Sequence, residues 1–362
     1  MLYLDIAHQA PLARRVHEAL LRFYDEGLYS AGPKPVWLDR VEEVRGRVAR
    51  FINAEPDEIA FTKNTSEGLN IAANAIPFRP GDNVLMIQGD HPNNAYAFLN
   101  LRRKGVEVRF LRLETETASA ETFAPHIDHR TRAISISHVT FHAGHRFDVE
   151  GIGRLCADRN LYFVVDAMQS IGVLPLDVRR MGASFLAAGS HKGLLVPQGL
   201  GLLYVRQGQD ELEQTYLATA GLADPPADLI ARADNMQLRD GARRFEMGNY
   251  NLPAVHALSA ALGMLEEVGP PSIAAHVLSL GDALIARLDE RGIPLVGPHA
   301  RDRRAHIYTL GLRGEAWLRH FTDNAVRVSP ERDGVRVSLG VFNEEKDLDR
   351  LCEVLDSGPS RR

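Results

Sequence analysis

Four short segments of this 362-residue chain carry residue types capable of chemistry, and the first centres on Lys192. Lysine is scarce, because only five of the 42 cationic residues are lysines. Lys192 has no acidic neighbour close in sequence and lies among small and apolar residues. Desolvation lowers the pKa of an amine, which is what a Schiff-base nucleophile needs. A solvated loop lysine is the alternative interpretation.

The second segment places Asp166 directly after the apolar run 161–165, with Gln169 shortly behind it. Burying a carboxylate costs free energy unless a cation or a strong donor meets it. A protonated heterocyclic nitrogen would meet this need, and a structural arginine would meet it equally well. The residues alone leave both interpretations open.

The other two segments also follow apolar runs. Thr65 and Ser66 open an apolar helix, where free amides and the helix dipole could bind a phosphate, although an ordinary N-cap uses the same residue types. His91 lies on the tight loop 88–94. Its ring could stack on an aromatic cofactor or lie in solvent.

Short apolar runs alternating with helical periodicity must position these residues. The runs predict strands at 58–62, 83–87, 106–110, 133–137, 161–165, 184–187 and 201–205. This alternation indicates an α/β fold with a mainly parallel, seven-stranded sheet covered on both faces. Ligands of such sheets bind beyond the carboxyl ends of the strands, where the four segments lie.

A change of pattern after about residue 265 predicts two domains. Longer helices and shorter strands follow there, and Gly and Pro interrupt the chain at 268–271. We predict a large domain over 15–265 and a smaller α/β domain formed by 1–14 and 266–362. The last elements of the small domain are predicted as a strand at 335–338 and a helix at 344–355.

Composition narrows the class of protein. The formal net charge of −5 offers no general basic surface for nucleic acid, so no nucleic-acid partner is expected. Two cysteines cannot build a disulfide framework, and the N-terminus lacks the layout of a signal peptide, so a cytoplasmic location is predicted. The stretch Met247 to Leu265 lacks charges other than histidine but is interrupted by polar residues, which predicts a buried helix and no membrane span.

In the order of the chain, eight motifs resemble those of the class V aminotransferase family, the pyridoxal phosphate (PLP) enzymes of fold type I that include cysteine desulfurases and isopenicillin-N-epimerase-like proteins. The resemblance covers nearly the whole chain and predicts fold type I. The motifs are Tyr3-Leu4-Asp5, Phe51-Ile52-Asn53-Ala54, Asn64-Thr65-Ser66-Glu67, Asp90-His91-Pro92-Asn93-Asn94, Asp166-Ala167-Met168-Gln169-Ser170, Ser190-His191-Lys192, Arg244-Phe245-Glu246-Met247-Gly248-Asn249 and Arg336-Val337-Ser338.

The resemblance implies a role for each segment. Lys192 would hold PLP as a Schiff base and move the proton at the α-carbon of an amino-acid substrate. Asp166 would keep the pyridinium nitrogen protonated so that the ring can accept electrons, and His91 would stack on the ring. Gln169 would contact the phenolic oxygen. The phosphate would be held by Thr65, Ser66, Ser190 and His191.

The resemblance also implies a homodimer with shared active sites. In the family a Gly-Thr pair from the partner subunit completes the phosphate site, and Gly248-Asn249 stands in that place here. Arg336 stands where the family binds the substrate α-carboxylate, a task suited to the guanidinium fork. Residues near the border of the family's site, namely His8, Tyr29, His142 and Arg244, are predicted to read the substrate side chain; scattered polar residues are the alternative.

Departures from the family pattern limit the reaction. Met168 replaces a ring-packing alanine, and Phe141 replaces an asparagine common in desulfurases. A persulfide-forming desulfurase needs a loop thiolate, yet the segment from His306 to Arg336 has no cysteine. Cys156 and Cys352 both fall in predicted helices, so this reaction is disfavoured.

We therefore predict an aminotransferase-type PLP enzyme. An isopenicillin-N-epimerase-like epimerase and a C–S or β-lyase are the alternatives. A PLP-fold protein without catalysis conflicts with the complete residue set, and a nucleotide-dependent oxidoreductase would need a glycine-rich fingerprint that is missing between Lys63 and Gly68. The histidines at 138, 142 and 145 lack accompanying carboxylates in sequence, so no metal is expected.

Overall fold

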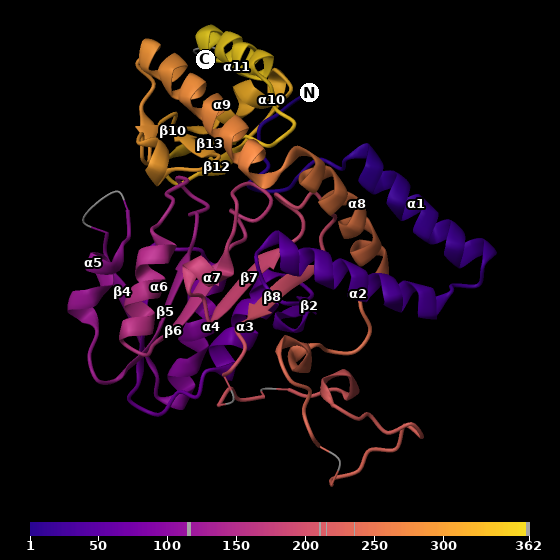
Figure 1. Ribbon diagram of the computed structural model, residues 1–362. Coiled ribbons are helices and arrows are strands. Elements are labelled where there is room, and N and C mark those ends of the chain that lie inside the picture. The colour runs from indigo at the N-terminus through magenta and orange to yellow at the C-terminus, as the bar shows by residue number, and fades with distance from the viewer. Residues whose placement is uncertain (114–116, 210, 215, 235, 360–362) are drawn as a thin grey trace.

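A seven-stranded sheet forms the centre of the larger part of the molecule (Figure 1). The computed structural model describes residues 1–113, 117–209, 211–214, 216–234 and 236–359. The strand order is β2-β8-β7-β6-β5-β3-β4, and only β8 opposes its neighbours. The predicted α/β fold with a mainly parallel, seven-stranded sheet is confirmed. The strands are β2 (Ile59–Thr62), β3 (Asn83–Ile87), β4 (Glu107–Leu111), β5 (Thr131–Ser137), β6 (Tyr162–Asp166), β7 (Phe185–Gly189) and β8 (Gly201–Val205).

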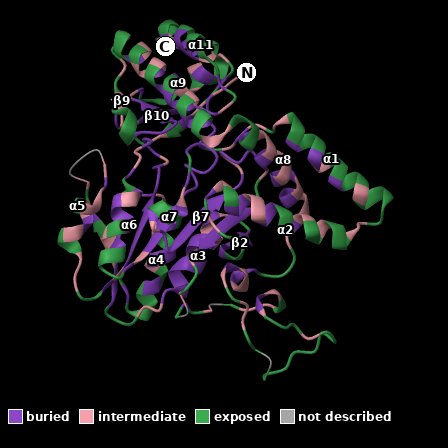
Figure 2. Ribbon diagram, viewed as in Figure 1, coloured by how far each residue is buried: buried purple, intermediate pink, exposed green. Residues whose placement is uncertain are grey.

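Helices cover both faces because the strands carry apolar side chains on both sides, and Figure 2 shows the strands buried. In β3, Val84 and Met86 pack into one core with α3 and α4, whereas Leu85 and Ile87 pack into the core on the other face. One face is covered by α3 (Thr65–Ala75) and α4 (Pro92–Leu99). The other is covered by α2 (Lys34–Phe51), α5 (Ala120–Phe123), α6 (Val149–Asp158), α7 (Val178–Met181) and α8 (Leu252–Val268).

A second, smaller layer of sheet and helices lies beyond the central sheet (Figure 1). Its four strands are antiparallel in the order β12-β13-β10-β9, and the N-terminal strand β1 pairs with β11. The strands are β1 (Leu2–Tyr3), β9 (Leu295–Val296), β10 (Ile307–Leu310), β11 (Val326–Arg327), β12 (Ser329–Glu331) and β13 (Gly334–Ser338). The helices are α9 (Pro270–Glu290), α10 (Glu315–Asp323) and α11 (Glu345–Ser357).

The division into domains stays a proposal, with one boundary refined. The predicted boundary at 265/266 lies inside α8, which continues to Val268. Gly269, with φ of +85°, separates α8 from α9, and the two helices are bent by 74°. A left-handed φ favours glycine, and the following Pro270 begins the new helix. We propose the division at Gly269, with residues 1–13 in the small domain before α1 (Arg14–Tyr29).

The apolar segment predicted as a buried helix corresponds to α8. Its apolar residues, including Leu258 and Leu262, are buried against the large domain. Within the described ranges, no single helix has the length and apolar composition to cross a membrane, and α8 with α9 meets that test only as a bent pair.

A long segment between β8 and α8 extends away from the central sheet (Figure 1). Its described part contains the short 3₁₀ helices η4 (Thr219–Gly221) and η5 (Ala242–Phe245) and an isolated antiparallel bridge between Leu222 and Leu238. Glu246 anchors its end: this buried carboxylate pairs with Arg45 at 2.7 Å and accepts hydrogen bonds from the Phe61 amide and the Tyr250 hydroxyl. The anchor holds the following residues, Gly248 and Asn249, beside β2.

We expect Glu246→Ala to lower the free energy of unfolding by about 3–5 kcal/mol, because the buried Arg45 guanidinium loses its buried carboxylate and keeps only the exposed Glu42 as an acidic partner. Denaturant unfolding of the purified protein measures the change. The control is Glu267→Ala, which removes an ion pair with Arg15. The side chains of Glu267 and Arg15 are 61% and 52% exposed, so loss of this pair should lower the free energy of unfolding by about 1 kcal/mol or less. A cost equal to the control's would contradict the anchoring role.

Candidate active site

A cavity of about 450 Å³ lies at the carboxyl ends of the strands and collects residues from four separate strand–helix connections. Asp166 ends β6, Lys192 follows β7, His91 precedes α4 and Thr65 begins α3. The strands β2, β3, β6 and β7 all point the same way, so their carboxyl ends meet at one edge. The predicted site residues that line the cavity are Thr65, Ser66, His91, Asp166, Gln169, His191 and Lys192.

Lys192 has the electrostatic setting of a nucleophilic amine. Burial, joined by the nearby charge of Arg336, lowers the pKa of Lys192 to about 8. Asp166 and Asp5 oppose this shift only from a distance, since the Nζ atom makes no ion pair or hydrogen bond with any described residue. About a tenth of the amine is therefore neutral at pH 7 and free to attack a carbonyl, far more than for an unperturbed lysine.

The lowered pKa of Lys192 predicts how fast the cofactor-free protein captures an aldehyde. The neutral amine is about 10% populated at pH 7 and about 90% at pH 9 for a pKa near 8, so the rate should rise about ninefold and then level off. Stopped-flow absorbance after mixing with PLP measures it, with N-acetyl-lysine methyl ester as the parallel reference for the ionisation of PLP itself. A rate that keeps rising above pH 10 would contradict the lowered pKa.

Asp166 is a buried carboxylate that lacks a cation. Burial raises the pKa of Asp166 to about 7, and the nearby Asp90 carboxylate adds to the rise. One oxygen accepts the Met168 amide at 2.9 Å, and the side chain lines the cavity. No arginine pairs with it among the described residues, so the structural-arginine alternative does not apply. A cationic N–H of a ligand is the partner that this carboxylate lacks.

His91 is held in a neutral form at the wall of the cavity. Its Nδ1 accepts the Asn93 amide at 3.1 Å, and burial together with Lys192 lowers the pKa of His91. The Phe141 ring meets the imidazole edge to face at 4.9 Å. A neutral, flat ring supported in this way suits contact with an aromatic ligand.

Asp90 fixes the loop that carries His91. Its carboxylate accepts four hydrogen bonds, from the His91 amide, the Asn94 side chain, and both the amide and the hydroxyl of Ser137. Asp90 thereby ties the end of β3 to the end of β5. It is a positioning residue, named in the sequence analysis only within the motif 90–94, without a role of its own.

The first turn of α3 offers donors for an anion. Asn64 caps the helix by accepting the Glu67 amide, so the amides of Thr65 and Ser66 have no carbonyl of their own helix to bind. Ser66 Oγ accepts Asn93 Nδ2 at 2.8 Å. Burial, followed by the charge of Lys192, lowers the pKa of His191 to about 4, which leaves its imidazole neutral. This end of the cavity suits a phosphate bound through neutral donors and a helix N-terminus.

Met168 lines the cavity with its sulfur held in place. The sulfur accepts the Thr65 hydroxyl at 2.9 Å and the Gly189 amide at 3.1 Å. A Cβ atom on Gly189 would lie 2.9 Å from this sulfur. A side chain at position 189 would have to displace this sulfur, so Gly189 leaves the space that Met168 fills.

Gln169 presents a buried amide oxygen that has no hydrogen-bond donor among the described residues. Its Nε2 donates to the Ala7 carbonyl at 3.0 Å, whereas its Oε1 is buried without a partner among the described residues. The carboxylate of Asp166, the free amine of Lys192 and this amide therefore all need a ligand. A PLP molecule, with a cationic ring nitrogen, an aldehyde, a phenolic oxygen and a phosphate, fits these needs.

Several predicted residues lie outside the cavity. The Ser190 hydroxyl is buried and donates to the Pro197 carbonyl at 3.2 Å, and it does not line the cavity with the other residues predicted to hold the phosphate. Ser190 lies one residue past the end of β7, and its backbone amide donates a hydrogen bond to the Leu200 carbonyl. Gly248 and Asn249 line a separate cavity of about 310 Å³ that shares Lys63 and Gly199 with the first.

The four residues predicted to contact the substrate side chain lie in different parts of the molecule, and none of them lines the cavity. His8 is exposed, and it lies close enough to His191 for its charge to help lower the pKa of the His191 imidazole. Tyr29 ends α1 with 80% of its surface exposed and does not reach the cavity of its own chain. Arg244 stacks on Phe245 in η5. His142 is buried against the hairpin formed by β12 and β13.

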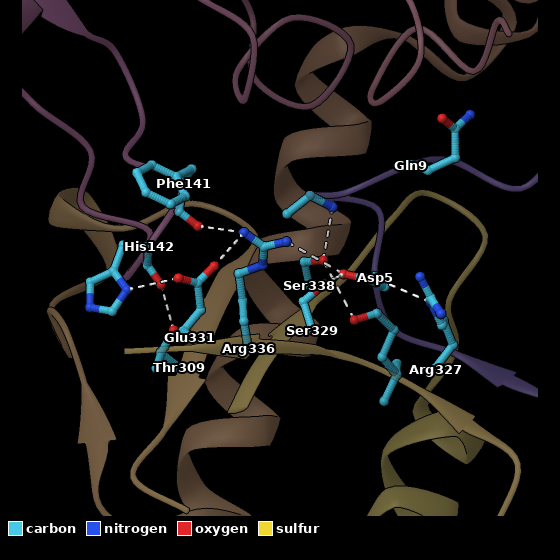
Figure 3. A network of polar contacts seen from close by, with 12 residues as sticks. Asp5, Gln9, Phe141, His142, Thr309, Arg327, Ser329, Glu331, Arg336 and Ser338 are labelled. Atoms are coloured by element: carbon cyan, nitrogen blue, oxygen red, sulfur yellow. Dashed lines mark hydrogen bonds and ion pairs between the residues drawn. The ribbon is translucent and has the colours of Figure 1, made fainter. Parts of the chain in front are cut away.

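Arg336 is buried and belongs to a polar network at the small-domain side of the site (Figure 3). Its Nη1 contacts Glu331 at 2.8 Å and the Phe141 carbonyl at 2.9 Å, and its Nη2 lies 3.5 Å from Asp5. It does not line the cavity, although its charge influences both Lys192 and His91. Glu331 was missed in the sequence analysis; the dipeptide Arg332-Asp333, which forms the turn of the hairpin, with Gly334 directly after it, was the available signal.

Comparisons with known proteins agree with this geometry. Residues 2–351 match the family model described as aminotransferase class-V. The chain is 33% identical to an uncharacterized aminotransferase of Schizosaccharomyces pombe over 98% of this chain and 91% of the relative. It is 34% identical to a probable cysteine desulfurase of Methanothermobacter thermautotrophicus over 78% of this chain and 71% of the relative.

Among solved structures, the cystine C–S lyase C-DES, in complex with its product cysteine persulfide, matches with a TM-score of 0.88 at 21% identity, over 99% of this chain and 98% of that chain. A C-DES variant holds glycine covalently linked to its PLP cofactor. These likenesses confirm the predicted fold type I.

Proposed function

Because the chain belongs to the class V aminotransferase family, whose enzymes depend on PLP, we propose that it acts at the α-carbon of an amino acid through Lys192 and that its main reaction is transamination. The observation that carries the proposal is the unpaired Lys192 amine, with its pKa lowered to about 8, in one cavity with the cation-free carboxylate of Asp166. The family and the cofactor predicted from the sequence are confirmed by the family match.

Four residues of the cavity, together with Arg336 outside it, have tasks in that reaction. When bound, PLP supplies an electron sink that stabilises negative charge at the substrate α-carbon. Asp166 would hold the proton on the ring nitrogen, and Thr65 and Ser66 would bind the phosphate through their amides. Lys192 would bind the cofactor aldehyde and, once released from it, move the proton at the α-carbon. Arg336 would orient the substrate carboxylate.

The cysteine positions speak against persulfide-forming desulfuration, although relatives are named as desulfurases. Cys156 is buried in α6, where burial raises the pKa of its thiol to about 12. Cys352 is buried in α11, and burial raises its pKa as well. The thiolate is the nucleophile in that reaction, so neither thiol suits it. A cytoplasmic location, with both thiols reduced, stays a prediction.

A C–S or β-lyase is the second candidate. Elimination needs the same amine, carboxylate and electron sink and no thiolate, and the fold matches a cystine C–S lyase. An isopenicillin-N-epimerase-like reaction stays the other alternative. The three differ in where the proton returns or whether a leaving group departs, which depends on small differences in geometry around Lys192.

A homodimer with shared active sites belongs to the same proposal. Gly248 and Asn249 do not line the Lys192 cavity of their own chain, but they line the neighbouring cavity that shares Lys63 and Gly199 with it, on a segment anchored by Glu246. A partner subunit would bring its copy of this pair to the phosphate end. Size-exclusion chromatography with light scattering tests the dimer.

A half-reaction screen tests the proposed reaction. The PLP-loaded protein is mixed with single amino acids, and the products are separated by chromatography. Formation of pyridoxamine phosphate and a 2-oxo acid supports transamination. Release of pyruvate and ammonia with unchanged PLP supports the lyase. Incorporation of solvent deuterium at the α-carbon, with no loss of the amino acid, supports the epimerase. A protein that stays colourless after incubation with PLP would refute the whole proposal.

A further inference from the structure

Two carboxylates already occupy the guanidinium of Arg336. Glu331 Oε1 contacts Nη1 at 2.8 Å, and Asp5 Oδ1 lies 3.5 Å from Nη2 (Figure 3). The Nε atom is buried and has no hydrogen-bond partner among the described residues. Arg336 is itself only 5% exposed. An arginine in this state is neutralised by the protein and still lacks one acceptor.

The two carboxylates differ in how firmly they are held. Asp5 is fully buried and accepts the Ser329 hydroxyl at 2.7 Å and Arg327 Nε at 3.3 Å. Glu331 ends β12 at the turn of the hairpin, and its side chain is 12% exposed. Glu331 is therefore the less buried of the two carboxylates and the one with fewer partners, so its displacement from Arg336 disrupts less of the network.

His142 provides Glu331 with a second partner. The His142 ring faces a carboxylate on each side, Glu331 at 3.2 Å from Nδ1 and Asp333 at 2.8 Å from Nε2. A ring nitrogen that carries a proton donates to the carboxylate that it faces. A Glu331 side chain that leaves Arg336 would keep its contact with His142.

We propose that Glu331 occupies the position on Arg336 that the carboxylate of the substrate takes, and that the substrate must displace it toward His142 in order to bind. The proposal rests on the proposed function, because it assumes that Arg336 receives the substrate carboxylate. Glu331 is then a specificity-determining residue. It weakens the binding of every carboxylate ligand and selects those amino acids whose remaining contacts offset the displacement.

The hairpin also provides a matched control. Asp333 carries the same charge, lies on the same turn and contacts the same histidine, but it makes no contact with Arg336. Removal of either carboxylate changes the local charge equally. Only removal of Glu331 frees Arg336, so a difference between the two variants isolates competition from general electrostatics.

The test measures binding of propionate, which has a carboxylate but no amine to react, and of propylamine, which has no carboxylate. Isothermal titration is performed on the PLP-loaded protein and its variants. We expect Glu331→Gln to tighten propionate binding on the order of tenfold, since a charged competitor for the arginine is lost, and to leave propylamine unchanged. Asp333→Asn should change propionate binding by about twofold or less, and Arg336→Leu should abolish it.

Unchanged or weaker propionate binding in Glu331→Gln would overturn the proposal, and so would equal tightening in Asp333→Asn. Glu331→Ala repeats the test if the glutamine variant melts at a lower temperature than the parent. Failure of the proposed function has a different signature: the visible absorption of bound PLP or the amino-acid half-reaction is missing, whereas the effect of Glu331 on propionate is measured without turnover.

Discussion

Lys192→Ala is expected to abolish both the attachment of PLP and turnover. The variant should show no absorption band that disappears on treatment with borohydride, and no cofactor should remain on the chain after borohydride and denaturation. Turnover in the half-reaction should fall by about 10⁴-fold or more, because the same amine binds the cofactor aldehyde and moves the α-proton. Absorption spectra, mass spectrometry of the reduced protein and product chromatography measure these losses.

Lys104 provides the control, since it is another of the five lysines and lies exposed at the end of a 3₁₀ helix. Lys104→Ala should keep the band, the borohydride-fixed cofactor and the turnover of the parent protein. Fixation of cofactor on Lys192→Ala at the level of the parent would mean that another amine carries the aldehyde, and the assignment would be lost.

Asp166→Asn should separate cofactor attachment from catalysis. Lys192 keeps its amine, so the absorption band and borohydride fixation should persist. An amide cannot hold a full positive charge on the ring nitrogen, and a neutral ring is a poorer electron sink, so turnover should fall by about 10²–10³-fold. Stopped-flow measurement of the half-reaction gives the rate, and equilibrium titration with PLP gives the affinity.

Asp166→Glu is the companion variant, because it keeps the charge but displaces the carboxylate by one methylene. We expect it to recover part of the lost rate, whereas a purely structural role of Asp166 would make the bulkier glutamate the worse variant. Turnover of Asp166→Asn equal to that of the parent would exclude the proposed pairing with the ring nitrogen.

The strands and the loops that follow them could be predicted from the sequence because their signals are local. Runs such as 84–87 are apolar at every position, as expected of a strand covered on both faces, and Asp166 and Lys192 stand at or shortly after the ends of such runs. The small-domain boundary was less sharp, since the apolar pattern of α8 ends at residue 265 but the helix continues through the charged Glu266 and Glu267 to Val268.

Side-chain direction at strand ends could not be predicted in the same way. Ser190 and Lys192 are two residues apart, yet the hydroxyl of Ser190 turns to the Pro197 carbonyl while Lys192 lines the cavity. The backbone pairing of Ser190 with Leu200 decides this, and that pairing depends on how β7 and β8 are aligned. Tyr29 illustrates the same limit, because its place depends on where α1 docks.

The sequence by itself determined the family, the cofactor, the order of the sheet-forming segments and the identity of the amine and carboxylate at its edge, because each of these is encoded in neighbouring residues. Only the tertiary structure decided what surrounds them. Arg336 is paired with Asp5, from the opposite end of the chain, and with Glu331 from the adjoining strand, and its third contact is the Phe141 carbonyl in the large domain. Such contacts depend on chain segments that meet only after folding, and they decide how a substrate carboxylate can enter.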